Sequence, residues 1–105
     1  MPKFDQLPAK ELFPGFVGRF VHGQQSTLAF WEIRGGCSIP NHQHPHEQIT
    51  HILEGTLEMK IGNEEFIFSA GSVYVIPPNT AHSAIAITNC KVLDAFSPAR
   101  DDYRF

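Results

Sequence analysis

Histidine is concentrated in one short stretch of the chain, where His42, His44 and His46 occupy alternate positions. In an extended backbone, side chains two residues apart point to the same face. His42 and His44 can therefore direct two imidazoles at one point. Imidazole is a ligand for Zn, Fe, Ni and Cu, and two converging rings supply half of a metal site. The stretch predicts a bound divalent metal ion, with further ligands from elsewhere in the chain.

The remaining ligands must come from another strand or from the same stretch. His82 follows a turn that begins with two prolines, at the expected start of a strand, and it is the best distant candidate. Closer by, His46 and Gln48 both share the parity of the first two histidines, so alternation does not choose between them. The alternative interpretation is a histidine-rich surface loop that binds nothing in particular, which leaves the position of His82 unexplained.

The elements that must position these residues are short strands separated by turn signals. Residues 56–61 alternate between apolar and polar, which is the period of a half-exposed strand. Short strands with turns about every 8–12 residues are typical of an antiparallel sandwich or barrel. No segment has a long helical period, and there is no internal repeat. The predicted strands cover residues 16–22, 26–34, 48–54, 56–61, 64–69, 72–76, 82–88 and 90–97.

The length of 105 residues fits one domain. We expect an extended N-terminal arm over residues 1–15 and a single β-barrel domain over residues 16–105. Three prolines interrupt regular structure in the arm and allow one short turn around residues 8–13.

Charge and composition exclude several classes of partner. The net charge of −3 argues against nucleic acid, because binding it requires a concentrated basic surface. No apolar run of about 20 residues is present to span a membrane. The N-terminus lacks the apolar core of a signal peptide, so the predicted location is cytoplasmic. In that reducing compartment Cys37 and Cys90 are expected to be thiols rather than a disulfide.

The last predicted strand carries an acidic residue where the barrel interior is expected. Asp94 and Phe96 share a face, and both point inward if Val92 does. A buried carboxyl group is costly unless it is paired, hydrogen-bonded or near a metal. Arg100, beyond the Pro98 bend, can return to the barrel mouth and hold a carboxylate through two hydrogen bonds. The simpler interpretation is an Asp94–Arg100 salt bridge that closes the barrel end and contributes about 0–1 kcal/mol.

Both histidine segments resemble the two sequence motifs of the cupin family. The first motif, G-x5-HxH-x3,4-E-x6-G, is matched by Gly36, His42, His44, Gln48 and Gly55. The second motif, G-x5-PxG-x2-H-x3-N, is matched by Gly71, Pro77 and His82. The resemblance implies an all-β fold, the cupin double-stranded β-helix or jelly-roll barrel.

The resemblance also implies the ligand set. A three-histidine, one-glutamine site occurs within the family, which favours Gln48 over His46 as the fourth ligand. His46 is then expected to support the site or line its rim, and Glu47, with opposite parity, to lie outside the ligand set or face solvent. The implied metal ligands are His42, His44, Gln48 and His82.

Three positions depart from the motifs: Gln48 replaces Glu, Asn79 replaces Gly, and Ala86 replaces Asn. Asparagine tolerates the left-handed turn conformation that glycine adopts. Four neutral ligands leave the charge of a divalent ion uncompensated, so the ion is a stronger Lewis acid and attracts anionic ligands. Ni, Fe, Mn, Zn and Cu all remain candidates, and no other cofactor is expected.

A second resemblance concerns two short segments, HPHEQITHILEG and LDAFSPARDDY. They are similar to the small cupins of pectin and alginate breakdown, which convert 4,5-unsaturated monouronates to linear keto forms and carry a D-x-F-x3-R ending. Asp94, Phe96 and Arg100 fall on that ending. The resemblance implies that Asp94 moves a proton, Arg100 grips the substrate carboxylate and Phe96 forms an apolar wall. Trp31 and Tyr74 are further candidates for pocket lining.

Two other functions stay open at this point. The chain is either another cupin enzyme, such as a dioxygenase or a sugar isomerase, or a non-catalytic cupin that binds a small metabolite. The expected partner is a small molecule, most simply a sugar acid, with neither nucleic acid nor membrane. The outward parity of Ile85 and Ile87, together with the apolar arm, predicts a homodimer through one sheet.

Overall fold

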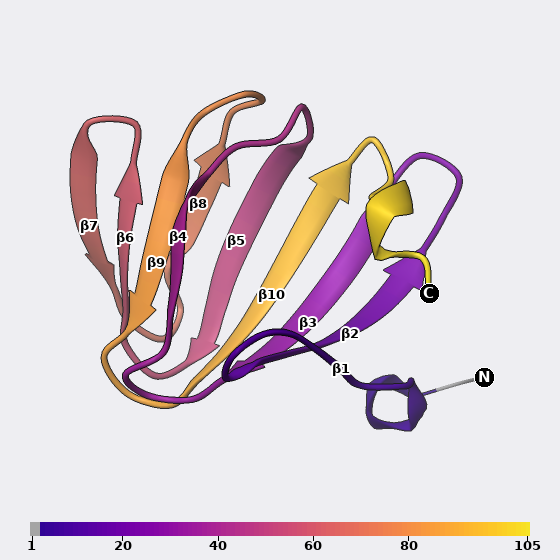
Figure 1. Ribbon diagram of the computed structural model, residues 1–105, viewed down its shortest axis with the longest axis horizontal. Helices are drawn as coiled ribbons and strands as arrows, with labels where there is room; N and C mark the ends of the chain where they lie inside the picture. The colour runs from indigo at the N-terminus through magenta and orange to yellow at the C-terminus, as the bar shows by residue number, and fades with distance from the viewer. Residues whose placement is uncertain (1–2) are drawn as a thin grey trace.

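The computed structural model describes residues 3–105 and folds them into two antiparallel β-sheets that face each other (Figure 1). The first two residues of the predicted arm lie outside this range. The six-stranded sheet has the order β1 (Lys10–Phe13), β2 (Phe16–His22), β3 (Thr27–Ile33), β10 (Cys90–Ser97), β5 (Glu47–Glu54) and β8 (Val73–Ile76). The four-stranded sheet has the order β4 (Ser38–His42), β9 (His82–Ala86), β6 (Leu57–Ile61) and β7 (Glu64–Phe68). The predicted all-β barrel is confirmed.

The two helices that the structure describes are single 3-10 turns, η1 (Phe4–Gln6) and η2 (Asp101–Tyr103). Neither has the length or the apolar run that would cross a membrane. The second turn follows β10 directly and lies over the β2–β3 end of the large sheet (Figure 1). This placement matters for function because the turn begins next to Arg100.

Strand bounds agree with the alternation of the sequence to within two residues, but two strands escaped prediction. Residues 10–13 form β1, paired with β2, where a short turn was expected around residues 8–13. That expectation is wrong: the turn lies earlier, at Phe4–Gln6, and the prolines at 8 and 14 flank the strand rather than interrupt it. The second missed strand, β4, contains Pro40, which an edge strand accommodates because one side needs no hydrogen bonds.

The core lies between the sheets and follows the period of the strands. Along β10 every second residue is buried, so Val92, Asp94 and Phe96 all point inward. Large apolar side chains such as Trp31 and Ile52 fill the rest of the interior. Full burial of such a side chain contributes about 1.5–3 kcal/mol. The buried Asp94 is therefore an exception within an otherwise apolar row, as the sequence predicted.

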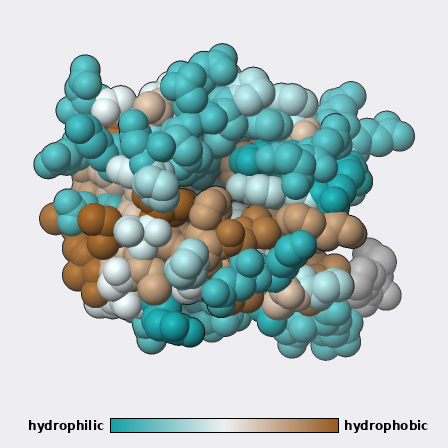
Figure 2. Space-filling view, viewed as in Figure 1, coloured by the Kyte–Doolittle hydropathy of each residue, from teal (hydrophilic) through white to brown (hydrophobic). Residues whose placement is uncertain are grey.

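Apolar side chains are not confined to the interior. The space-filling view shows a band of them across the middle of one face, with polar side chains above and below it (Figure 2). Ile85 and Ile87 are 47% and 50% exposed, which agrees with their predicted outward parity. The two cysteines are free thiols, also as predicted.

Candidate functional site

Three histidines, from β4, the loop that follows it and the neighbouring strand β9, converge at one end of the barrel. His42 ends β4, His82 begins β9, and the two are partners in the strand register. His44 follows in the loop after β4. One ligand atom from each ring lies within 4.8 Å of the others, and the centroids of the His42 and His82 rings are 4.3 Å apart. The structure thus brings together the three histidines that the motifs single out.

Each of these rings is oriented by a backbone carbonyl two positions away in the sequence. A carbonyl oxygen only accepts hydrogen bonds, so the ring nitrogen facing it, Nδ1, must carry the proton. The other nitrogen, Nε2, is left with a lone pair directed at the cluster. The three Nδ1–oxygen distances are 3.0 Å from His42 to Pro40, 3.0 Å from His44 to His46 and 2.8 Å from His82 to Thr80.

Gln48 adds a fourth acceptor to the cluster. Its side-chain nitrogen donates to the Thr50 hydroxyl at 3.0 Å, which turns its oxygen toward His44 Nε2, also at 3.0 Å. In this orientation two lone pairs face each other, an arrangement that repels unless a cation lies beside them. Nε2 of His82 is likewise buried without a hydrogen-bond partner. Three imidazole nitrogens and an amide oxygen fit a divalent metal ion.

Burial favours the neutral form of His44 and His82, which is the form that binds a metal. Desolvation lowers the pKa of His82 to about 4, although its hydrogen bond to the Thr80 carbonyl acts in the opposite direction. Desolvation also lowers the pKa of His44, helped by the positive charge of Arg100. At neutral pH both rings therefore present lone pairs rather than protons.

The two neighbours of the ligand stretch lie beside the cluster. His46 is not in the converging group; its ring centroid is 5.5 Å from that of His44 and 6.4 Å from that of Phe96. Glu47 is exposed to solvent. His46 therefore lies next to the histidine cluster without joining it.

Asp94 is the buried acid of the site, with 6% of its surface exposed. One carboxyl oxygen, Oδ2, accepts a hydrogen bond from the indole nitrogen of Trp31 at 3.0 Å, and the other, Oδ1, is buried without a hydrogen-bond partner. Burial raises the pKa of Asp94 to about 6, although Thr50, Gln48, Trp31 and Arg100 all oppose the rise. The group therefore titrates close to neutral pH.

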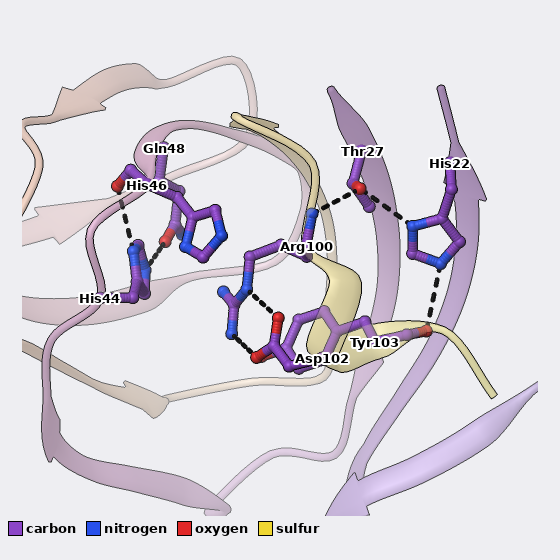
Figure 3. A network of polar contacts seen from close by, with 8 residues as sticks. All are labelled: His22, Thr27, His44, His46, Gln48, Arg100, Asp102 and Tyr103. Carbon is purple, nitrogen blue, oxygen red and sulfur yellow. Dashed lines mark hydrogen bonds and ion pairs between the residues drawn. The ribbon is translucent and has the colours of Figure 1, made fainter. Parts of the chain in front are cut away.

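Arg100 does not form the alternative salt bridge with Asp94. Its guanidinium instead holds both oxygens of Asp102, at 3.0 Å from Nε and 2.8 Å from Nη2, because the η2 turn places that carboxylate two residues away. It lies 3.9 Å from the Tyr103 ring centroid and 4.7 Å from that of Phe96. Figure 3 shows it between the His44–Gln48 side of the site and the C-terminal turn.

A single cavity joins the histidine cluster to the C-terminal residues. Its lining includes His42, Gln48 and His82 together with Asp94, Phe96 and Arg100. Trp31, predicted as a candidate lining residue, is part of this wall. Tyr74 is not, because its ring packs against Phe66 and Phe68 instead.

Sequence reasoning missed several residues that line or support the cavity, among them Thr50, Asp102 and Tyr103. Thr50 shares the parity of Gln48 on β5, so alternation alone could have identified it. Asp102 and Tyr103 act through the fold of the η2 turn, for which the sequence carries no comparable signal.

The chain is similar to known proteins in both sequence and structure. The family described as "Cupin domain" matches residues 29–96. The pectin degradation protein KdgF of Dickeya dadantii is 26% identical over 102 residues, which cover 94% of this chain and 93% of that protein. KdgF from Halomonas sp. superposes with a TM-score of 0.89 at 29% identity, covering 95% of each chain. An RmlC-like cupin from Shewanella frigidimarina superposes with a TM-score of 0.92 at 22% identity, covering 98% of this chain and 94% of that one.

Proposed function

The chain belongs to the cupin family, and from this premise we propose that it is a metal-dependent enzyme that opens 4,5-unsaturated monouronates to linear keto forms. The observation that carries the proposal is the shared cavity: Asp94, Phe96 and Arg100 line the same space as the histidine cluster. The similarity to a pectin degradation protein over nearly the whole chain supports the same class of substrate.

The metal side of the cavity has one task in this proposal. His42, His44, His82 and Gln48 would hold a divalent ion through three ring nitrogens and an amide oxygen. Bound in this uncharged ligand set, the ion supplies a Lewis acid that favours the negative charge developing on substrate oxygens. The uncharged ligands add no repulsion against an anionic substrate.

Arg100 would bind the substrate carboxylate. Asp102 occupies Nε and one N–H of Nη2, and neither of these two bonds uses the N–H groups of Nη1. A guanidinium held along one edge in this way can still offer hydrogen bonds to a second anion. Phe96 lies against the same group and would limit where the sugar ring can settle.

Asp94 would move the proton that the reaction requires. Ring opening removes a proton from the anomeric hydroxyl and breaks the bond between C1 and the ring oxygen, which leaves an aldehyde at C1 and an enolate at C5. Protonation of C4 then gives the ketone, so the whole conversion is an isomerisation. A single carboxyl group that takes up and returns a proton satisfies this balance, and the free Oδ1 of Asp94 is available for it.

The proposal is tested with metal-reconstituted protein and a 4,5-unsaturated monouronate. The loss of alkene absorbance is followed against a protein-free control, because the sugar also opens spontaneously. Asp94→Asn with the same metal content is the matched control. We expect clear acceleration by the native protein alone and no oxygen consumption. Bound metal without acceleration would overturn the proposal and favour oxygen-dependent chemistry or simple metabolite binding.

We further propose that the protein is a homodimer through the outer face of the six-stranded sheet. One cross-strand row on this face carries no charge, and it consists of Val21, Leu28, Ala95, Ile49 and Val75. The aligned row around Ile85 on the other sheet is interrupted by Glu58. In a dimer with a two-fold axis, the uncharged row of one subunit would pack against the same row of the other.

Light scattering tests the dimer. Ile49→Lys should convert a dimer into a monomer, because it places a charge in the uncharged row, whereas Ile85→Lys should leave the mass unchanged. A native protein with monomer mass would contradict the proposal. A change caused by Ile85→Lys alone would move the interface to the other sheet.

A further inference from the structure

The segment that carries Arg100 is held by a part of the chain remote in sequence. After β10 the chain bends and enters the η2 turn, whose own backbone hydrogen bonds fix its shape but not its position on the barrel. The end of the β2–β3 hairpin lies against it (Figure 3). His22 is the last residue of β2 and Thr27 the first of β3, and the two are partners in the strand register.

Three hydrogen bonds form a network in which two join the hairpin to the turn and one links His22 to Thr27 within the hairpin; in addition, Arg104 donates to the Gly23 carbonyl at 3.0 Å. The backbone N–H of Arg100 donates to the Thr27 hydroxyl at 2.9 Å. His22 Nδ1 lies 2.9 Å from the same hydroxyl, and His22 Nε2 lies 3.1 Å from the carbonyl oxygen of Tyr103. The hairpin therefore contacts the turn at both ends: at Arg100, immediately before the turn, and at Tyr103, its last residue.

The directions of these hydrogen bonds follow from the chemistry of the groups. The Tyr103 carbonyl can only accept, so His22 Nε2 carries the proton and, in the neutral ring, Nδ1 accepts. The Thr27 hydroxyl must then donate to His22 while it accepts from Arg100. With a neutral His22 ring, only one assignment of donors and acceptors gives every group in this hydrogen-bond network a partner.

No water can replace the central hydroxyl easily. Thr27 has 0% of its surface exposed. Arg100, whose backbone N–H donates to it, is 7% exposed. Loss of the hydroxyl would leave a buried backbone N–H without a partner, which is costly in the folded state. The turn would then relieve the cost by shifting, and the guanidinium would move with it.

We propose that Thr27 and His22 are positioning residues that hold Arg100 where it can bind a substrate carboxylate. The catalytic meaning of this inference rests on the proposed function, whereas the placement of the guanidinium does not. Neither residue lines the cavity, so each would act through the turn rather than on the substrate. Nothing in the cupin motifs includes either position.

The first test compares Thr27→Val with Thr27→Ser. Valine keeps the shape but lacks the hydroxyl, and serine keeps the hydroxyl. We expect Thr27→Val to lower kcat/KM by about tenfold, chiefly through a higher KM, with metal content unchanged. Serine should restore most of the loss. In an Arg100→Lys background, Thr27→Val should cause no further loss, since its effect passes through Arg100.

The second test is independent of activity. The Nε–H of Arg100, bonded to Asp102, should give a slowly exchanging signal in a proton–nitrogen NMR spectrum, assigned by its absence in Arg100→Lys. Thr27→Val should accelerate this exchange, whereas Thr27→Ser should not. If Thr27→Val prevents folding, His22→Ala replaces it, with His51→Ala as the control histidine.

The two tests separate the two proposals. Native protein that fails to open the uronate, combined with exchange that depends on the Thr27 hydroxyl, would reject the proposed function and retain the positioning role. Unchanged exchange and unchanged KM in Thr27→Val would overturn the positioning role, whatever the native activity. A loss that serine does not restore would also overturn it, because it would trace to packing alone.

Discussion

The two sides of the cavity are held in place by different kinds of contact. On the metal side, each histidine is oriented by a carbonyl two residues away, and Gln48 by a threonine two residues away. On the C-terminal side, Arg100 depends on Thr27, which is 73 residues distant, and the turn that follows depends on His22, 81 residues from Tyr103. Side chains on the metal side are oriented by local contacts, whereas the C-terminal side combines the local Arg100–Asp102 ion pair with long-range contacts to the hairpin.

This difference has a physical consequence. Local hydrogen bonds orient each ring once the strand exists, so removing one ligand should leave the others oriented. Long-range contacts form only when two distant segments pack, so removing one partner frees the whole turn. A substitution on the metal side should therefore remove one ligand and leave the others oriented. A substitution on the C-terminal side should instead weaken the placement of the whole turn, so that several residues are affected together.

The largest effect is expected from His82→Ala. Loss of one of three converging nitrogens should abolish stoichiometric metal binding while the barrel still folds, because His82, although buried, is not part of the hydrophobic core cluster. Metal analysis and circular dichroism measure the two quantities. His51→Ala, on the outer face of β5, is the matched control. Unchanged metal content in His82→Ala would show that the histidine cluster is not the metal site.

Asp94→Ala should retain the metal and reduce turnover by about 10²–10⁴-fold, the usual contribution of a residue that transfers a proton. The measurement is kcat at a fixed metal content, alongside the melting temperature. Activity close to that of the native protein would remove Asp94 from the mechanism and leave it a structural acid bonded to Trp31.

Asp94 and His82 should change the free energy of unfolding with pH in opposite directions. The pKa of Asp94 is raised from 3.8 to about 6, so between these values the folded protein keeps a proton that the unfolded chain has lost. Its contribution is thus present at low pH and is lost as pH rises toward 6, by about 3 kcal/mol in all. His82, with a lowered pKa, acts oppositely: its contribution is lost as pH falls from 6.5 toward 4.

Urea unfolding of metal-free native protein and Asp94→Asn at several pH values isolates the acid. The stability advantage of Asp94→Asn should grow between pH 4 and pH 6 and then level off. The contribution of His82 cancels in this difference, since both proteins contain it. A difference that does not change with pH would mean that Asp94 is not desolvated in solution.

The smallest effect is expected from Asp102→Asn. The amide keeps one hydrogen-bond acceptor for Arg100 but loses the charge, and the Asp102 side chain is 57% exposed, so solvent weakens the ion pair. We expect KM to rise by a few-fold, with kcat and metal content nearly unchanged. A fall in kcat with constant KM would instead place Asp102 in the chemical step.

Much of the fold was accessible from the pattern of residues. Alternation located the strands of the interior, and Asn79, in place of a motif glycine, does adopt a left-handed φ of 59°. Alternation failed for β1 and β4, because each is an edge strand flanked or interrupted by proline and carries a weak apolar period. The inward direction of Asp94 followed from parity alone, since β10 is regular across its length.

The sequence by itself determined what depends on short separations: the strand period, the family motifs and the histidines aligned on one face. Tertiary structure decided where the C-terminal turn lies, because the β2–β3 hairpin holds it there, and in this position Arg100 pairs with its neighbour Asp102 and not with Asp94. The physical reason is range. Parity constrains the direction of a side chain within one strand, but the contact between two segments 73 residues apart depends on how the whole barrel packs.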